Sequence, residues 1–216
     1  MSALMHTAAP IVYVVDDDLS VRESLSSLIR SAGLQVEVFD SPQSFMAREY
    51  SDGCACLILD VNMPEVDGFE LQKRLAKEGR DIPIIFITGY GDVPLAVRAM
   101  KAGALEFLNK PFNDEDLLES IRDALSRSRK ACQEREELAD LSARFNSLTA
   151  RERDVVFQVA QGTANKCVAG NLGVSESTVK VHRHNIMQKM RVASLPELAL
   201  ALQRLRKNVL QDSFEK

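Results

Sequence analysis

The chain has 216 residues, of which 45% are hydrophobic and 27% charged, so it can form two domains with buried cores and is not composed like a disordered protein. Its apolar runs are far shorter than the roughly 20 residues of a membrane-spanning helix, and its first ten residues lack a secretory pattern, so we expect a cytoplasmic protein without a membrane partner. The net charge of −4 hides an asymmetry, since residues 1–124 carry −10 and residues 147–216 carry +5, which indicates nucleic acid as a candidate partner of the basic part.

Five short apolar segments alternate with amphipathic ones in the first part of the chain. The apolar segments have the length and β-branched content of strands; they are Ile11 to Val15, Val36 to Phe39, Cys54 to Leu59, Ile82 to Thr88 and Leu105 to Leu108. The intervening segments have the apolar spacing of helices and lie near Ser20 to Ser31, Ser41 to Glu49, Gly68 to Lys77 and Val93 to Ala102. This alternation predicts an α/β, doubly wound sheet of five parallel strands.

Polar side chains follow these strands where each one ends. The first strand ends in Asp16 and Asp17, the third in Asp60, the fourth in Thr88 and the fifth just before Lys110. Because the carboxyl ends of parallel strands meet at one edge of a sheet, we expect these groups to lie close together. Clustered carboxylates repel one another unless a cation lies among them, and oxygen ligands suit Mg²⁺, with Mn²⁺ as an alternative.

This set of side chains is suited to phosphoryl transfer, in which catalysis is mainly positioning and charge neutralisation. Asp60 is the predicted nucleophile, because a carboxylate can accept a phosphoryl group as an acyl phosphate. Lys110 and Thr88 are the predicted partners of the transferred group. The competing interpretation is a set of unrelated polar residues, which requires four elements to supply matching groups by chance.

Residues 125–146 are predicted to form a helical linker, since no Gly or Pro occurs from Asp114 to Ala143. The middle of this segment, Arg127 to Glu137, is mostly charged, which is more typical of a solvated or dimer-forming helix than of either core. The domains are thus predicted as 1–124, 125–146 and 147–216. The cysteines have neither disulfide nor zinc-site spacing, and we expect incidental thiols; they are Cys54, Cys56, Cys132 and Cys167.

The C-terminal part predicts an all-α helix-turn-helix. Thr149 and Glu152 have the spacing of a capping box, Gly173 marks a tight turn, and Ser175 can cap the second helix. When the side chains of that helix are projected at 100° per residue, one stripe is apolar; it contains Val179, Ile186 and Met190. The opposite stripe is polar and suits the DNA major groove; it contains Ser177, Lys180, Val181, His184 and Gln188.

Neighbouring polar residues complete the predicted DNA-binding set, although a solvated basic face remains the alternative interpretation. They are Asn165, Lys166, Thr178, Arg183 and Lys189.

Four sequence blocks resemble the receiver domain of bacterial response regulators: V-V-D-D-D, D-V-N-M-P-E-V-D-G from Asp60, F-I-T-G-Y-G-D from Phe86 and F-L-N-K-P-F from Phe107. The resemblance implies a flavodoxin-like fold in which Asp17, Asp60 and the backbone carbonyl of Asn62 bind Mg²⁺ and Asp16 acts largely through water. It implies that Lys110 and Thr88 contact the phosphoryl oxygens and that the Lys110-Pro111 bond is cis.

The same resemblance implies a switch formed by Thr88 and Phe107, in which the aromatic ring rotates inward once the hydroxyl moves toward the phosphate. Tyr90 and Asn62 flank the expected path of the hydrolytic water. We therefore expect these two residues to set the lifetime of the acyl phosphate.

The blocks L-T-x-R-E-R, N-K-x-V-A-x-x-L and S-x-S-T-V-K-V-H-R resemble the LuxR-type DNA-binding domain. With the receiver domain they resemble the NarL/FixJ response regulators, most closely the FixJ branch. This implies a bacterial two-component protein that accepts a phosphoryl group from a sensor histidine kinase, dimerises, and binds promoter DNA to regulate transcription by RNA polymerase. It is not expected to be an enzyme beyond its own phosphoryl acceptance and slow dephosphorylation.

Three other functions fit the sequence less well. A phosphatase of the haloacid-dehalogenase type needs a second Asp two residues after the nucleophile, where this chain has Asn62. A regulator that binds a small ligand would leave the strand-end polar set without a role. An RNA-binding output is disfavoured because side chains cannot read the deep, narrow major groove of A-form RNA.

Overall fold

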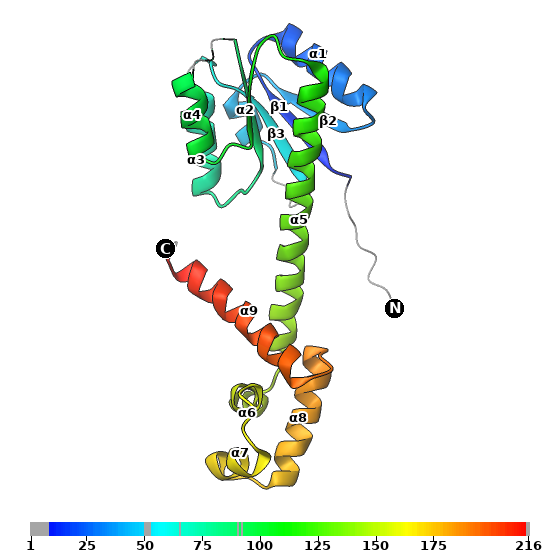
Figure 1. Cartoon of the computed structure of the whole chain (residues 1–216), viewed down its shortest axis with the longest axis vertical. Coiled ribbons are helices and arrows are strands. Elements are labelled where there is room, and N and C mark those ends of the chain that lie inside the picture. The colour runs from blue at the N-terminus through cyan, green and yellow to red at the C-terminus, as the bar shows by residue number, and fades with distance from the viewer. Residues whose placement is uncertain (1–8, 50–52, 65, 90, 92, 215–216) are drawn as a thin grey trace. The chain divides into compact units, whose positions relative to one another are not determined.

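The computed structural model describes residues 9–49, 53–64, 66–89, 91 and 93–214 (Figure 1). They form two compact units, which divide between Gln133 and Glu134. Within the described ranges, no helix combines the length and the apolar character needed to cross a membrane.

The N-terminal unit is built on a sheet of five parallel strands in the order β2-β1-β3-β4-β5. The strands are β1 (Ile11–Val15), β2 (Gln35–Phe39), β3 (Ala55–Asp60), β4 (Ile84–Thr88) and β5 (Glu106–Asn109). Strand β3 is central and buried along its whole length. The predicted five-stranded parallel sheet is confirmed, with strand ends that differ from the prediction by two residues at most.

Helices cover both faces of this sheet, as predicted. Helices α1 (Leu19–Ser31) and α5 (Asp114–Asn146) pack on the face that carries Cys56 and Ile58 of β3. Helices α2 (Pro42–Met46), α3 (Gly68–Lys77) and α4 (Val93–Lys101) accompany the other face, which carries Leu57 and Leu59. Successive side chains of β3 point to opposite faces of the sheet, so they contribute to two separate hydrophobic cores. This is expected for a strand that is covered by helices on both faces.

Helix α5 is a single helix of 33 residues, and the boundary between the units falls within it. The expectation that its charged middle lies outside both cores is wrong for Ser128 and Cys132, which are 4% and 6% exposed. Ser128 Oγ accepts a hydrogen bond of 2.9 Å from the backbone amide of Ala55 at the start of β3. The charged residues between them are exposed on the outer side of α5. The high average charge of this segment therefore gave no sign of the narrow stripe of α5 that is buried.

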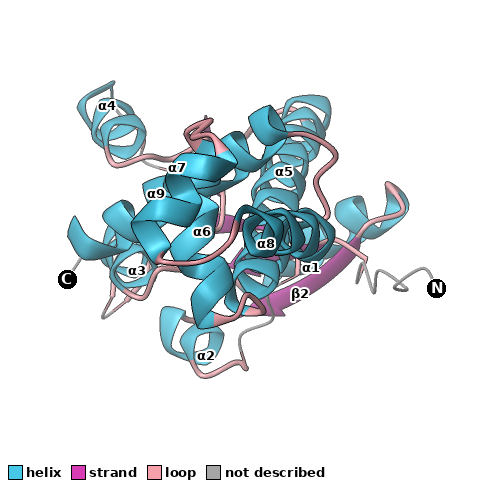
Figure 2. Cartoon of the chain, turned by 90° about the horizontal axis from the view of Figure 1, so that it is seen from below, coloured by secondary structure: helices cyan, strands magenta, loops and turns pink. Residues whose placement is uncertain are grey.

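The C-terminal unit consists of helices and loops in its described residues (Figure 2). After the end of α5 come α6 (Ala150–Ala160), α7 (Asn165–Leu172), α8 (Glu176–Met190) and α9 (Leu195–Phe214). The predicted capping box is present at Thr149 and Glu152. Gly173 ends α7 in the left-handed region with φ of 65°, and Ser175 caps α8 by accepting from the amide of Thr178. The predicted helix-turn-helix is therefore formed by α7 and α8.

Candidate functional site

The strand order of the N-terminal unit places one group of polar residues at a topological switch point. Strands β1 and β3 are neighbours, although β2 lies between them in sequence and pairs on the other side of β1. The connections that leave β1 and β3 therefore diverge, and ligands of sheets with this topology generally bind at such a point, outside the carboxyl ends of the strands. Asp16 directly follows β1, and Asp60 is the last residue of β3.

The ammonium of Lys110 bridges these two carboxylates. Lys110 Nζ donates to Asp16 Oδ2 at 2.6 Å and to Asp60 Oδ1 at 3.0 Å. Asp16 and Asp60 are 1% and 5% exposed. Lys110 follows β5, its own amide donates to the carbonyl of Thr88 at 2.7 Å, and its bond to Pro111 is cis. Three strands thus contribute to one buried ionic group.

The charge balance of this group is uneven, since one ammonium serves two carboxylates. Burial raises the pKa of Asp60 above its ordinary value, although Lys110 opposes the shift. Burial would lower the pKa of Lys110, but its hydrogen bonds to Asp16 and Asp60 outweigh that effect and raise it. Lys110 is therefore held as a cation beside a carboxylate whose charge is only partly compensated.

Asn62 links the Asp60 carboxylate to the hydroxyl of Thr88. The backbone amide of Asn62 donates to Asp60 Oδ2 at 3.0 Å, and its side-chain Nδ2 donates to Thr88 Oγ1 at 3.2 Å. Thr88 is completely buried at the end of β4. Phe107 on β5 is partly buried and packs against the core on the α3 and α4 side. Tyr90 lies outside the described residues.

Asp17, the other predicted metal ligand, is exposed at the rim of this site. In the described part of the chain, no group of three or more His, Cys, Asp or Glu side chains is already arranged to hold a metal ion. The donor chemistry nevertheless fits a hard divalent cation, because Asp16, Asp17 and Asp60 offer only oxygen and exceed the charge of Lys110 by two.

Two further residues shape the site and were missed by sequence reasoning. Gly68, at the start of α3, lies so close to β3 that a Cβ there would be 2.5 Å from the carbonyl oxygen of Asp60. Arg22 of α1 donates from Nη1 to the carbonyl oxygen of Asp16 at 2.7 Å. The glycine was visible in the block that begins at Asp60, whereas nothing in the spacing of Arg22 indicated its partner.

The second group of predicted site residues lies on α8. The predicted apolar stripe is buried, since Val179, Ile186 and Met190 are 0% exposed. All members of the polar stripe are exposed; these are Ser177, Lys180, Val181, His184 and Gln188. Thr178 is partly buried in the first turn, where its amide donates to the cap Ser175.

The cationic side chains predicted to contact phosphates differ in whether they already pair with other residues of the unit. Lys166 is exposed on α7. Arg183 Nη1 donates to Asn165 Oδ1 at 2.8 Å and thereby joins α8 to α7. Lys189 Nζ lies 2.7 Å from Glu152 Oε2, and Glu152 is 3% exposed. Lys189 is therefore already paired within the unit, and a phosphate contact would compete with this pair, because releasing Lys189 would leave a buried carboxylate without its cation.

Comparison with known protein families assigns both units. Residues 12–122 match the family model of the response regulator receiver domain, and residues 146–202 match the model of bacterial regulatory proteins of the luxR family. The chain belongs to the two-component response regulators that join a receiver domain to a LuxR-type DNA-binding domain. The resemblance inferred from the sequence blocks is thus confirmed, and the three other functions are disfavoured.

Similar proteins extend over nearly the whole chain. The response regulator protein TmoT of Ectopseudomonas mendocina is 48% identical over 202 residues, which cover 94% of this chain and 92% of TmoT. The transcriptional regulatory protein FixJ of Azorhizobium caulinodans is 43% identical, over 87% of this chain and 89% of FixJ. The solved structure of the response regulator StyR is 49% identical, with a TM-score of 0.84 over 91% of this chain and 100% of StyR.

These matches make the chain a transcriptional response regulator of a two-component system. A receiver domain implies a histidine kinase as its partner, and a LuxR-type domain implies promoter DNA. Receiver domains as a family bind Mg²⁺ at their phosphorylation site. Helix α8 is the second helix of the helix-turn-helix and is called the recognition helix below.

Proposed function

We propose that Asp60 is the phosphoacceptor of the receiver domain. The observation that carries this proposal is the buried Asp60 carboxylate, which Lys110 joins to Asp16 and which lies beside Thr88 and Asn62. In the reaction, an oxygen of Asp60 bonds to phosphorus as the bond from phosphorus to the kinase histidine breaks, and the electron pair of that bond returns to the imidazole. Lys110 and Thr88 then contact the oxygens of the transferred group.

Asp16, Asp17, Asp60 and the carbonyl of Asn62 would hold Mg²⁺, which supplies the remaining positive charge for the transferred group. Thr88 and Phe107 would form the switch, in which the Thr88 hydroxyl, which accepts from Asn62 Nδ2, moves toward the phosphoryl oxygens. Asn62 and Tyr90 would set the lifetime of the acyl phosphate. An unchanged dephosphorylation rate after replacement of both residues would exclude that role.

The exposed stripe of the recognition helix would contact DNA, with Lys180 on a phosphate or base edge and Val181 against a thymine methyl. Lys166 and Arg183 would add phosphate contacts. Phosphorylation would favour a homodimer that binds promoter DNA and acts on RNA polymerase. Phosphorylated protein that remained monomeric in sedimentation at micromolar concentration would contradict the dimer.

The test of the phosphoacceptor uses the full chain, acetyl phosphate and Mg²⁺. The expected result is an increase in intact mass by one phosphoryl group in the unmodified protein and no increase in Asp60→Asn. Asp81→Asn is the matched control, because Asp81 is an exposed carboxylate of the same unit. Labelling of Asp60→Asn at the unmodified rate would refute the assignment.

A further inference from the structure

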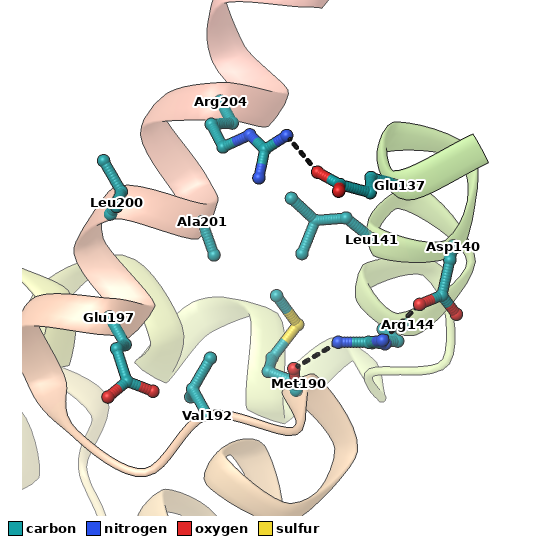
Figure 3. Close-up of a pocket in the computed structure, with 10 residues that line it drawn as sticks. All are labelled: Glu137, Asp140, Leu141, Arg144, Met190, Val192, Glu197, Leu200, Ala201 and Arg204. Carbon is teal, nitrogen blue, oxygen red and sulfur yellow. Dashed lines mark hydrogen bonds and ion pairs between the residues drawn. The ribbon is translucent and has the colours of Figure 1, made fainter. Parts of the chain in front are cut away.

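The last turns of α5 are built into the DNA-binding unit. Leu141 is 8% exposed in the core of that unit, and Phe145 packs against the same core. Arg204 of α9 donates to Glu137 of α5 at 2.9 Å across the seam between the two helices (Figure 3). The part of α5 that follows Gln133 therefore has specific partners and is more than a spacer.

Arg144 connects this part of α5 to the end of the recognition helix. Its Nη1 donates to the carbonyl oxygen of Met190 at 3.4 Å, and its Nη2 pairs with Asp140, one turn earlier on α5 (Figure 3). Met190 is the last residue of α8, so its carbonyl has no amide partner further along the helix. A cation at this end also interacts favourably with the helix dipole.

The orientation of the Arg144 guanidinium is fixed by its contacts to Asp140 and to the carbonyl oxygen of Met190. Arg144 Nε is buried and has no hydrogen-bond partner in the described residues. An unpaired buried donor costs free energy, so the side chain keeps this position because of its contacts to Asp140 and Met190 and the surrounding packing. Met190 itself is 0% exposed. The contact therefore joins two well-packed segments.

A neighbouring contact holds the same end of α8. Lys189 Nζ lies 3.5 Å from the carbonyl oxygen of Ser147, which directly follows α5, and 2.7 Å from the buried Glu152 at the start of α6. The last turn of the recognition helix is thus held by α5 and by the turn that leaves it.

A short helix moves as a rigid body, so the position of its end determines the position of its exposed face. The DNA-facing side chains Lys180, Val181 and His184 and the anchored residue Met190 all belong to the same 15-residue helix. Recognition of base edges depends on bidentate and methyl contacts that tolerate only small displacements. A loosened C-terminal end of α8 would therefore weaken binding to a specific sequence more than binding to DNA in general.

We propose that Arg144 is a positioning residue for DNA recognition: it holds the end of α8 through the Met190 carbonyl and so sets how the exposed face of α8 meets DNA. This inference rests on the proposed DNA contacts of α8.

The experiment uses the phosphorylated full chain and two duplexes, one selected from a random pool by the unmodified protein and one with that sequence scrambled. Arg144→Met is expected to bind the selected duplex about ten-fold more weakly, with little change for the scrambled one. The dependence of affinity on salt stays the same, whereas loss of a phosphate contact would reduce its slope by about 1. Asp140→Asn acts in the same direction with a smaller loss.

Two further variants separate positioning from folding. Arg144→Lys is expected to recover part of the affinity, because an ammonium can donate to Met190 but lacks the planar fork that also holds Asp140. Arg129→Met is the matched control, since Arg129 is an exposed arginine of α5 in the receiver unit, and it should bind like the unmodified chain.

Three results would overturn the inference: unchanged affinity of Arg144→Met, an equal loss on both duplexes, or a salt slope reduced by about 1. An equal loss would indicate general unfolding, and a reduced slope would indicate direct phosphate contact. If the unmodified protein selected no duplex at all, the proposed function of α8 would fail, and this inference would fail with it.

Discussion

The ammonium of Lys110 lies 3.0 Å from Oδ1 of Asp60, at the carboxyl end of the central strand. Because the same ammonium also donates to Asp16, it neutralises only part of the charge on Asp60. Burial accordingly raises the pKa of Asp60. The proposed phosphoryl transfer requires this arrangement, and the organisation of a reactive site commonly costs stability.

Asp60→Asn should therefore stabilise the metal-free receiver domain at pH 7, by about 1 kcal/mol. The folded-state pKa of Asp60 lies above the ordinary value of 3.8, so the cost of its charge is complete above the folded-state pKa and disappears as the pH falls below 3.8. Urea unfolding in EDTA at a series of pH values measures this difference. Asp81→Asn should show none, and an Asp60→Asn variant less stable than the unmodified protein at pH 7 would contradict the argument.

Gly68→Ala should displace the backbone of Asp60, the proposed phosphoacceptor. The added Cβ would lie 2.5 Å from the carbonyl oxygen of Asp60, so either the start of α3 or the end of β3 must move. We expect a loss of about 2 kcal/mol in unfolding free energy and slower labelling by acetyl phosphate. Gly89→Ala is the control, because a Cβ there meets nothing within 4 Å. Equal stabilities of the two variants would show that the close approach is easily relieved.

Glu152→Gln should destabilise the DNA-binding unit in a pH-dependent way. Burial opposes the charge of Glu152, but the bonds from Lys189 and Thr149 outweigh it and hold the pKa of Glu152 below its usual 4.5. The resulting stability is present above pH 4.5 and is lost as the pH falls through the lowered folded-state pKa. We expect a loss of about 2 kcal/mol at pH 7 that shrinks in acid. Urea titrations test it, with exposed Glu136→Gln as control.

Lys180→Met and Lys189→Met should separate DNA contact from internal pairing. Lys180 is exposed on α8, so its loss should reduce the salt slope of DNA binding by about 1 without changing stability. Lys189 is paired with Glu152, so its loss should lower the unfolding free energy and leave the slope nearly unchanged. Binding titrations at several salt concentrations, together with thermal unfolding, distinguish the two. The opposite pattern would show that Lys189 contacts DNA.

The sequence was sufficient to predict the strands and the meeting of Asp16, Asp60 and Lys110, because strand ends in a parallel sheet converge on one edge. Periodicity likewise predicted the buried and exposed faces of α8. The partner of Lys189 could not be predicted, since a cation bound to DNA and a cation paired with a distant Glu152 look alike in a charge pattern. The role of Arg144 was hidden for the same reason, because its partner is a backbone carbonyl 46 residues away.

The hydrogen bond from the Ala55 amide to Ser128 determines where the receiver domain can be separated from the rest of the chain. A fragment that stops at residue 124 would remove Ser128 and leave the backbone amide of Ala55, the first residue of the strand that carries Asp60, without this hydrogen bond. Unfolding and phosphorylation measured on such a fragment would describe a weakened strand. A fragment that ends after Gln133 retains Ser128 and therefore keeps the hydrogen bond to the first residue of β3.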